Sequence, residues 1–332
     1  MIKMHYCLTI IRSLKLKIKL MMKKIIQLVS GPINNFRYFF YDFKQAIYYS
    51  AILDNTEDKS KARIMLAMHS LEKGLAFMDK KQNWGGEKAI YLTRLLKKHI
   101  ITYGKCEVII VALNVLNAYL YDKYSTKDVT IRTEINQLLK KNNSDLKPSR
   151  GGVKVVTYPE YKINYNDILQ FYKARSSIRN FSIRPIADEE IAKAKQIART
   201  TPTACNRQTS RIHVFKNNEE IKKILDNQWG DQGWGNNADT LFIITSDLSY
   251  FGDTYERSQA YIDGGMFAMN FVMGLHAQKI ASCFKMYIRE PKIEKKFKKL
   301  TQIPQQEVPI VLILAGHYLD STLSPISYKI EI

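Results

Sequence analysis

Cysteine is scarce in this chain of 332 residues, and no two of its cysteines form a CxxC pair. The four present are Cys7, Cys106, Cys205 and Cys283. Zinc ribbons need paired cysteines, and disulfide frameworks belong mainly to small secreted chains, so the sequence favours neither a zinc site nor a disulfide scaffold. Widely spaced cysteines in a chain of this size predict a protein of the reducing cytoplasm.

Long hydrophobic runs are also missing, most clearly in residues 1–29. Lys and Arg interrupt each apolar stretch there before it reaches the roughly 18–20 residues that a membrane-spanning helix needs. The segment lacks the apolar core and the small-residue cleavage site of a secretory signal. Two interpretations stay open: a basic amphipathic helix in peripheral contact with an anionic membrane, and a helix packed on its own domain.

Acidic residues are few relative to basic ones. The chain has 51 Lys and Arg against 31 Asp and Glu, a formal net charge of +20. Such an excess is typical of proteins with anionic partners, but also of a well-solvated, lysine-rich surface. The basic residues are spread along the chain and no nucleic-acid-binding motif accompanies them, so we expect no specific nucleic-acid partner.

What is present indicates a folded chain of more than one domain. Hydrophobic residues make up 45% and charged residues 25%, which is ordinary for a globular protein. We predict a helical N-terminal region over residues 1–145, a linker over 146–164 that contains Pro148 and Gly151-Gly152, and a second domain over 165–332.

Hydrophobic periodicity gives the expected elements. In the N-terminal region it predicts helices around 63–74 and at 87–101, 107–121 and 126–141. In the second domain it predicts helices at 165–174, 188–200 and 261–278, and strands at 211–215, 240–245, 280–284 and 308–315. Helices that alternate with short strands indicate an α+β domain.

Three separated stretches of the second domain carry groups suited to a phosphorylated, planar ligand. The first, residues 175–179, has Arg175 and Arg179 four residues apart with Ser176 and Ser177 between them, which suits a phosphate and polyol clamp. The second, residues 201–208, follows a helix and offers the amides of Asn206 and Gln208. The third is Ser282-Cys283-Phe284, which follows a helix rich in small residues.

The order of these motifs resembles the FMN-dependent nitroreductase superfamily, over roughly Ile168 to the C-terminus. The resemblance implies a mixed, largely antiparallel sheet flanked by helices, and it assigns the FMN-binding residues. The FMN phosphate, the ribityl chain and the pyrimidine side of the ring would be held by Arg175, Ser176, Ser177 and Arg179. The ribityl chain and the ring edge would contact Asn206 and Gln208. The ring face would lie against Ser282, Cys283 and Phe284, and the phosphate would also be reached by Lys329. We expect all of them to form one pocket.

The chain departs from the family pattern at two places. Thr209-Ser210 stands where members often have Pro-Trp, and Gln278-Lys279-Ile280 stands where Gly-Leu-Gly is usual. FMN binding tolerates both differences more readily than substrate choice does.

The implied function is an FMN-dependent oxidoreductase. NADH or NADPH and a small-molecule electron acceptor would take turns over the same flavin face, a ping-pong scheme that needs no catalytic side chain. The resemblance also implies a homodimer with FMN at the subunit interface, for which the 261–278 helix is the candidate contact. The alternative is a flavin-fold scaffold without turnover, docked to membrane or polyanion by its basic N-terminal half, with surface-polysaccharide biosynthesis as one setting for that role.

The N-terminal region has a signature of its own, Met68 to Leu75. It resembles a His-x-x-Glu-Lys-Gly-Leu motif of helical extensions fused to nitroreductase-like domains. On a helix, His69 and Glu72 share one face, and Gly74 is placed to end the helix. No neighbouring helix offers a matching ligand pattern, so the pattern favours a structural ion pair over a metal site.

Overall fold

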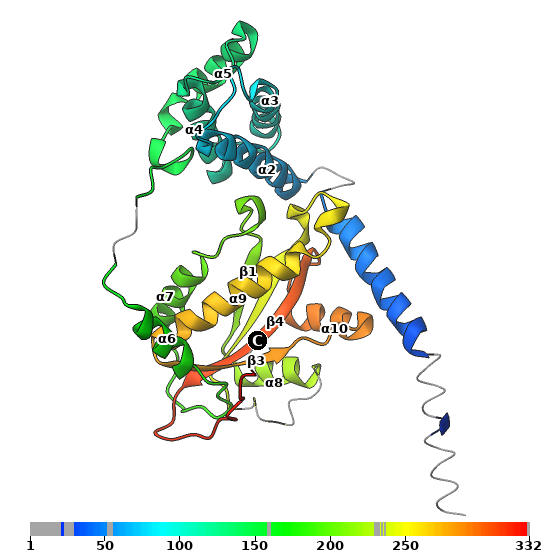
Figure 1. Cartoon of the computed structure of the whole chain (residues 1–332). Helices are drawn as coiled ribbons and strands as arrows, with labels where there is room; N and C mark the ends of the chain where they lie inside the picture. The colour runs from blue at the N-terminus through cyan, green and yellow to red at the C-terminus, as the bar shows by residue number, and fades with distance from the viewer. Residues whose placement is uncertain are drawn as a thin grey trace, which may run out of the picture.

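The computed structural model describes residues 21–22, 30–51, 56–157, 161–228, 233, 235 and 237–330. Figure 1 shows a group of helices above a sheet that is flanked by further helices, and another helix runs away from the body. This arrangement confirms the predicted fold class, an α+β domain preceded by an all-helical region.

A four-stranded antiparallel sheet forms the centre of the C-terminal domain. Its strands are β1 (Ser210–Phe215), β2 (Thr240–Asp247), β3 (Ile280–Met286) and β4 (Glu307–His317), in the order β1-β2-β4-β3. All three strand pairings are antiparallel. One isolated parallel bridge, Ser177 to Ser282, extends the sheet at the β3 edge.

Alternation along the strands gives the sheet two buried faces. Leu241, Ile243, Leu312 and Leu314 pack with α8 (Asn218–Asp226) and α10 (Pro291–Thr301). Phe242, Ile244, Ile313 and Ala315 pack with α7 (Asp188–Ala198) and α9 (Gln259–Ala277). The central strands are therefore apolar on both sides, and they read in the sequence as unbroken hydrophobic runs.

Helices α7 and α9 lie unusually close together at Gly274. A Cβ added at Gly274 would lie 2.8 Å from both the Cα and the carbonyl oxygen of Ala194. A backbone neighbour cannot rotate away as a side chain can, so only glycine fits at this crossing. The small residues of α9 therefore serve helix packing at this end.

The helical region consists of α2 (Glu57–Ala76), α3 (Gly86–Tyr103), α4 (Glu107–Tyr121) and α5 (Val129–Lys141) around one core. The segment after α5 continues to pack on it: the backbone amide of Lys147 donates to Asn114 Oδ1 at 2.8 Å. The chain then continues to α6 (Tyr165–Ala174), which begins and ends at the predicted residues.

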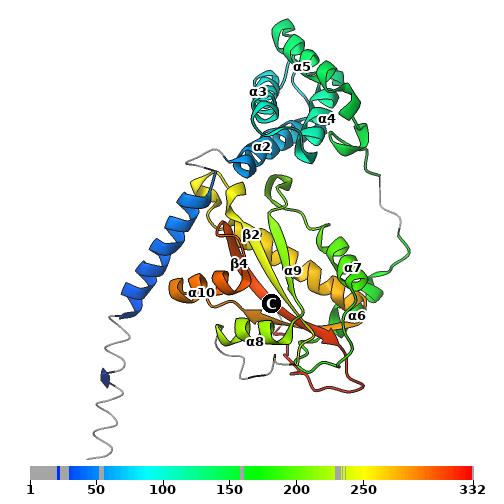
Figure 2. The same cartoon turned by 180° about the vertical axis from the view of Figure 1, so that it is seen from behind.

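The helical region touches the C-terminal domain through α2. This helix lies against η3 (Ala204–Asn206) and η4 (Leu248–Tyr250), and Tyr250 is part of the helical core. Residues 30–49 form the helix that leaves the body, seen from behind in Figure 2. Its end is held where Ala51 N donates to the Phe251 carbonyl at 2.8 Å and Arg63 Nη2 donates to the Ala51 carbonyl at 2.6 Å.

Two helices of the domain, α8 and α10, do not appear among the predicted elements. Both are short and mostly charged, and their few apolar residues recur at helical spacing. Each is fixed by an N-terminal cap, from Asn217 in α8 and from Glu290 in α10, and by its buried contact with the sheet. Tertiary burial therefore supplies much of what defines them.

Candidate functional site

The 175–179 stretch runs beside β3. The backbone amide of Ile178 donates to the Ser282 carbonyl at 3.1 Å, next to the Ser177–Ser282 bridge. Arg175, Ser176, Ser177 and Arg179 are all partly exposed, whereas Ser282 is buried. Two of the three predicted stretches therefore meet at one edge of the sheet, although their nearest residues are about a hundred positions apart in the chain.

Cys283 shows that the two arginines act electrostatically on β3. Burial raises the pKa of its thiol, while the charge of Arg179, a hydrogen bond with Ser177 and the charge of Arg175 act in the opposite direction. The net pKa remains above its usual value, so Cys283 is a neutral, buried thiol and not a nucleophile. The next residue, Phe284, is 37% exposed and presents an apolar ring at the sheet edge.

The C-terminal tail passes the same place. Ser324 Oγ donates to the Ser177 carbonyl at 3.3 Å, and Arg179 Nη1 donates to the same oxygen at 3.3 Å. Lys329, five residues further along, is exposed, and none of the ion pairs found among the described residues includes it. The tail thus approaches the arginine segment at Ser324, and Lys329 follows it as an exposed cation.

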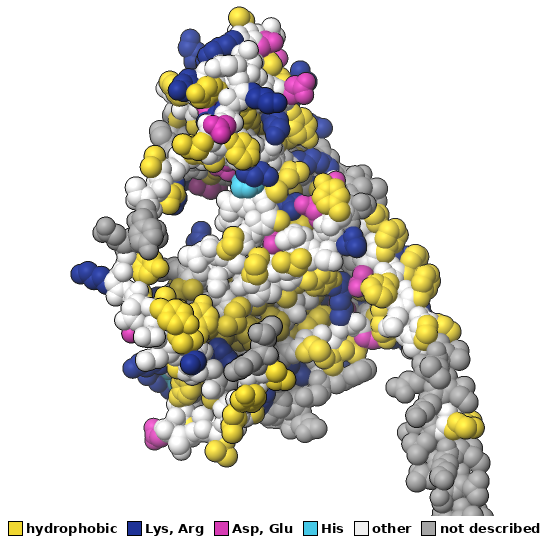
Figure 3. Space-filling view, in the orientation of Figure 1, with side chains coloured by type: hydrophobic (Ala, Val, Ile, Leu, Met, Phe, Trp, Pro, Cys, Tyr) yellow, Lys and Arg dark blue, Asp and Glu magenta, His cyan; other side chains and the backbone are white. Residues whose placement is uncertain are grey.

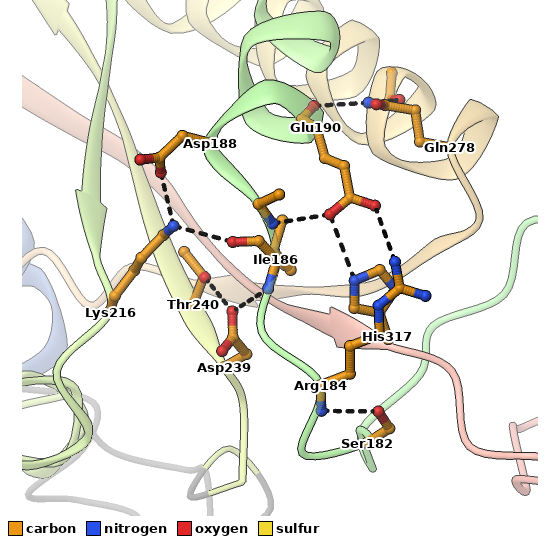
Figure 4. Close-up of polar contacts among 12 residues, drawn as sticks. Ser182, Arg184, Ile186, Asp188, Glu190, Lys216, Asp239, Thr240, Gln278 and His317 are labelled. Atoms are coloured by element: carbon orange, nitrogen blue, oxygen red, sulfur yellow. Dashed lines mark hydrogen bonds and ion pairs between the residues drawn. The ribbon is translucent and has the colours of Figure 1, made fainter.

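Figure 4 shows how the first turn of α7 is fixed close to this edge. Glu190 accepts from the Ala187 amide at 2.8 Å and lies 3.5 Å from His317 Nε2. Gln278 Nε2 donates to the Glu190 carbonyl at 2.7 Å. Arg184, 4.0 Å from Glu190, is mostly exposed. These residues rim a cleft of about 590 Å³ that Ala174 and Tyr318 also line.

The 203–208 loop is built differently. Cys205, Asn206 and Gln208 all have left-handed backbone conformations, with φ of 52°, 51° and 51°. Such φ values are costly for residues other than glycine, and they persist only where the surroundings hold them. Here the buried carboxylate of Asp263 in α9 accepts from the Ala204 amide at 3.0 Å. The loop therefore presents Asn206 and Gln208 to solvent in a fixed shape.

Arg207 is the anchor that sequence reasoning missed. It is only 2% exposed, and its guanidinium donates to both carboxylate oxygens of Glu256 and to the Tyr250 carbonyl. The guanidinium also lies 4.9 Å from the centroid of the Phe251 ring. An arginine between two amides in a loop resembles a ligand-binding residue. Only the fold shows that its charge is neutralised inside the protein.

A single chain does not bring all the predicted residues into one pocket. Ser282 pairs with Ala315 on β4, whereas Ser210, next to the loop, lies in register with Ser246 and hence with Val308. Seven residues of β4 separate Ala315 from Val308, which is roughly 20 Å at about 3.3 Å per residue. Asn206 and Gln208 thus lie at the opposite end of the sheet from Arg175 and Arg179, so one chain by itself does not bring these residues together into the expected pocket.

The N-terminal signature has a structural role. His69 Nδ1 lies 3.3 Å from Glu72 Oε2, and the other oxygen of Glu72 accepts from the Gly152 amide at 3.3 Å. This pair ties α2 to the segment that follows α5. Gly74 does not end the helix as expected, because α2 continues to Ala76. Its role is packing: an added Cβ would lie 2.3 Å from the Trp84 ring.

The C-terminal half of the chain is similar to known proteins. The nitroreductase family model matches residues 172–232 and 225–317. A Methanothermobacter thermautotrophicus protein, provisionally named NADH dehydrogenase/NAD(P)H nitroreductase, is 24% identical over 169 residues, which cover 50% of this chain and 84% of that protein.

Two solved structures are also similar. A nitroreductase family protein of Streptococcus pneumoniae is 20% identical, with a TM-score of 0.42, and covers 49% of this chain and 96% of its own. An FMN-dependent nitroreductase of Clostridium difficile is 16% identical, with a TM-score of 0.41, and covers 48% and 92%. The nitroreductase family model thus matches residues 172–317, the part of the chain that contains the three sequence motifs.

Proposed function

We propose that this protein is an FMN-dependent NAD(P)H oxidoreductase that works as a homodimer. In the proposed site, Arg175, Ser176, Ser177 and Arg179 of one subunit hold FMN beside β3, and the 206–208 amides come from the second subunit. The observation that carries the proposal is the pairing of the arginine segment with β3 in a nitroreductase-family domain.

The residues at this edge fit a flavin phosphate and ring. Two guanidiniums and two serine hydroxyls lie within one five-residue segment, which matches the anionic and polyol parts of FMN. Ser282, Cys283 and Phe284 supply a strand whose backbone and exposed ring suit a flat aromatic system. The ring-edge amides are absent from this end of the chain, so the site is complete only with a second copy.

Helix α9 offers a surface for that second copy. Ile262, Met266 and Met269 are between 38% and 51% exposed, and they follow one another at helical spacing. The exposed Phe284 and Met286 of β3 add to the apolar surface of the domain. Figure 3 shows hydrophobic side chains gathered on this side of the domain. An apolar row of this kind is typical of a homodimer contact.

When bound, FMN would supply the electron-transfer chemistry, taking a hydride from NADH or NADPH and reducing a small-molecule acceptor. The chain's own residues bind and orient it. Arg175 and Arg179 neutralise the phosphate, Ser177 and Ser282 fix the segment against β3, and the rigid 203–208 loop positions its amides. No side chain is required as nucleophile or general base. We place this activity in the cytoplasm and keep residues 146–164 as the connecting segment.

The absorbance spectrum of the purified protein tests this proposal. We expect a flavin spectrum, yellow in colour, that bleaches when NADH or NADPH is added without oxygen and returns when an acceptor is added. A colourless protein that cannot be reconstituted with FMN would contradict the proposal and leave the fold without turnover.

The dimer is tested by charging the α9 row. Ile262→Asp with Met266→Asp should convert a dimer into a monomer in light-scattering chromatography, because unpaired like charges in a buried apolar contact are costly. Flavin content should fall with it, since the second subunit supplies Asn206 and Gln208. Ile101→Asp is the control, because Ile101 is equally apolar and 86% exposed but lies on α3. A variant that stays dimeric and yellow would exclude this face.

A second candidate role, docking to an anionic membrane, is favoured by the helix over residues 30–49. Phe36, Phe40 and Phe43 stack along one side of it and are 71%, 48% and 59% exposed. Hydrophobic side chains follow this helix in Figure 3. In the sequence before it, residues 1–29 contain seven Lys and Arg and no Asp or Glu; apart from 21 and 22 they lie outside the described residues. Aromatic rings beside cations suit a lipid interface.

Vesicle flotation tests this second role. The full chain should float with vesicles that contain anionic phosphatidylserine and not with neutral phosphatidylcholine vesicles, and Phe36→Ser with Phe40→Ser should weaken flotation about tenfold or more, since each ring loses its apolar burial. Tyr91→Ser, at an exposed site on α3, is the control. Equal flotation of all three proteins would exclude the aromatic face. No helix within the described ranges is long and apolar enough to cross a membrane.

A further inference from the structure

A cleft of about 480 Å³ lies between the helical region and the strained loop of the C-terminal domain. Met65 and Met68 of α2 and Val108 and Val111 of α4 line one side of it. Asn206, Gln208, Arg211 and Tyr250 line the other. Its volume falls within the range of small-molecule sites, roughly 300–1,000 Å³. The helical region, which has no part in the proposed FMN site, thus provides the apolar half of a separate cleft.

The charges of the cleft point to an anionic ligand. Arg207 is paired with Glu256, and Arg150, at the rim, is paired with Glu107. Arg211 has no carboxylate within ion-pair distance in the part of the chain that the structure describes, and its charge acts at longer range on the carboxyls of Asp247 and Glu307. Its hydrogen bonds to the carbonyls of Gln208 at 2.8 Å and Ser210 at 3.1 Å both use Nη1.

Those two bonds also hold Arg211 in place. They fix one end of the guanidinium against the loop, and the group lies 5.7 Å from the centroid of the Tyr250 ring. A planar guanidinium positioned in this way, with donors to spare, matches a carboxylate.

The apolar side favours an aromatic ring. Met65 and Met68 lie three residues apart on α2, are almost fully buried and line the cleft. Methionine side chains adapt to flat rings and make favourable sulfur–aromatic contacts. A ligand that places an aromatic ring over the methionines and a carboxylate at Arg211 would therefore fit both sides of the cleft.

The cleft also adjoins the proposed flavin site. Gln208 and Arg211 line a second, smaller cleft of about 250 Å³ on the α7–α9 side, together with Thr203 and Phe267. Gln208 is one of the two amides that the proposed dimer brings to the flavin of the other subunit. A ligand in the larger cleft would therefore lie directly beside the Gln208 amide.

We infer that this cleft binds an aromatic carboxylate, and that the electron acceptor belongs to this chemical class. The acceptor role depends on the proposed function, whereas binding does not. For a nitroaromatic acid the step balances as follows: NAD(P)H gives two electrons and one proton, the buffered solvent gives one further H+, and the nitro group becomes a nitroso group while one of its oxygens leaves as water.

Binding of 4-nitrobenzoate, compared with its uncharged analogue 4-nitrobenzamide, tests the inference in the full chain by equilibrium dialysis. We expect nitrobenzoate to bind about tenfold or more tightly than the amide, which is the usual effect of one charge-assisted bond. Arg211→Gln should remove that preference and Arg211→Lys should restore part of it. Val108→Trp, which fills the apolar side, should abolish binding of both compounds.

Arg94→Gln is the matched control. Arg94 is exposed on α3, outside the cleft, and its loss changes the net charge by the same amount. Equal weakening in Arg94→Gln and Arg211→Gln, or normal binding in Val108→Trp, would overturn the inference. Flavin content is measured on the same samples. A protein that binds nitrobenzoate but not FMN would refute the proposed function alone, and a yellow, NAD(P)H-oxidising protein without the preference would refute the cleft alone.

Discussion

Replacing Arg175 and Arg179 together with alanine should weaken FMN binding by about a hundredfold to ten-thousandfold. Each guanidinium is expected to make a charge-assisted hydrogen bond to the phosphate, and such bonds contribute about 1.5–3 kcal/mol each. The quenching of FMN fluorescence on titration with apoprotein measures the loss directly. Unchanged affinity in the double variant would remove the basis of the proposed site.

Two further variants separate ligand binding from local structure. Arg179→Lys keeps the positive charge but loses the guanidinium that donates to the Ser177 carbonyl, so it should keep more affinity than Arg179→Ala. Arg184→Ala is the control, because Arg184 is a nearby arginine whose side chain is 70% exposed and 4.0 Å from its partner Glu190. Equal losses at positions 179 and 184 would indicate a general charge effect.

Replacing Arg207 with methionine should lower the free energy of unfolding by about 3–5 kcal/mol. The change leaves the Glu256 carboxylate inside the protein without its partner, and breaking one side of a buried ion pair costs that much because the remaining charge is uncompensated. It also releases the 203–208 loop from the 250–256 segment. Urea denaturation followed by circular dichroism measures the effect.

The double variant Arg207→Met with Glu256→Met is the internal control. It removes both charges, so its stability should recover toward that of the original protein. If the double variant is as unstable as the sum of the two single variants, the pair is not coupled and Arg207 acts only through packing.

Lowering the pH should weaken the stabilising contribution of the Arg207–Glu256 ion pair. Burial by itself would raise the pKa of Glu256, but hydrogen bonds from Arg207 and the Gly252 amide outweigh it, and the net pKa lies below the usual value. A carboxyl with a depressed folded-state pKa contributes stability above its unfolded pKa and loses that contribution as pH falls through the folded value. The Arg207→Met variant should therefore lose less stability than the original protein on acidification.

Local sequence identified most of the elements that the structure contains. The helix at 165–174 has the predicted bounds, and 107–121 does so as well, because apolar residues recur there at helical spacing. The strands at 240–247 and 307–317 were recognisable as apolar runs. The short helices α8 and α10 were not predicted, although their few apolar residues recur at helical spacing between charged ones, and burial of those residues against the sheet stabilises both helices.

The candidate site was likewise predicted only in part from the sequence. The residue types of 175–179, 206–208 and 282–284, and their order, are properties of the sequence, and they were sufficient to recognise the nitroreductase family. Which of them meet was not determined locally. Ser177 reaches Ser282 because the 175–179 segment runs along β3. Gln208 lies far away because it precedes β1, which forms the opposite edge of the sheet.

The sequence by itself determined the helix and strand periods, the two-arginine segment and the family of the C-terminal half, because each depends on residues close together in the chain. The tertiary structure alone decided that Arg207 is a buried anchor while Arg211, four residues later, faces a cleft. It also decided that α2 packs on the strained loop. The physical reason is that burial and charge neutralisation depend on neighbours that the fold brings together from distant positions.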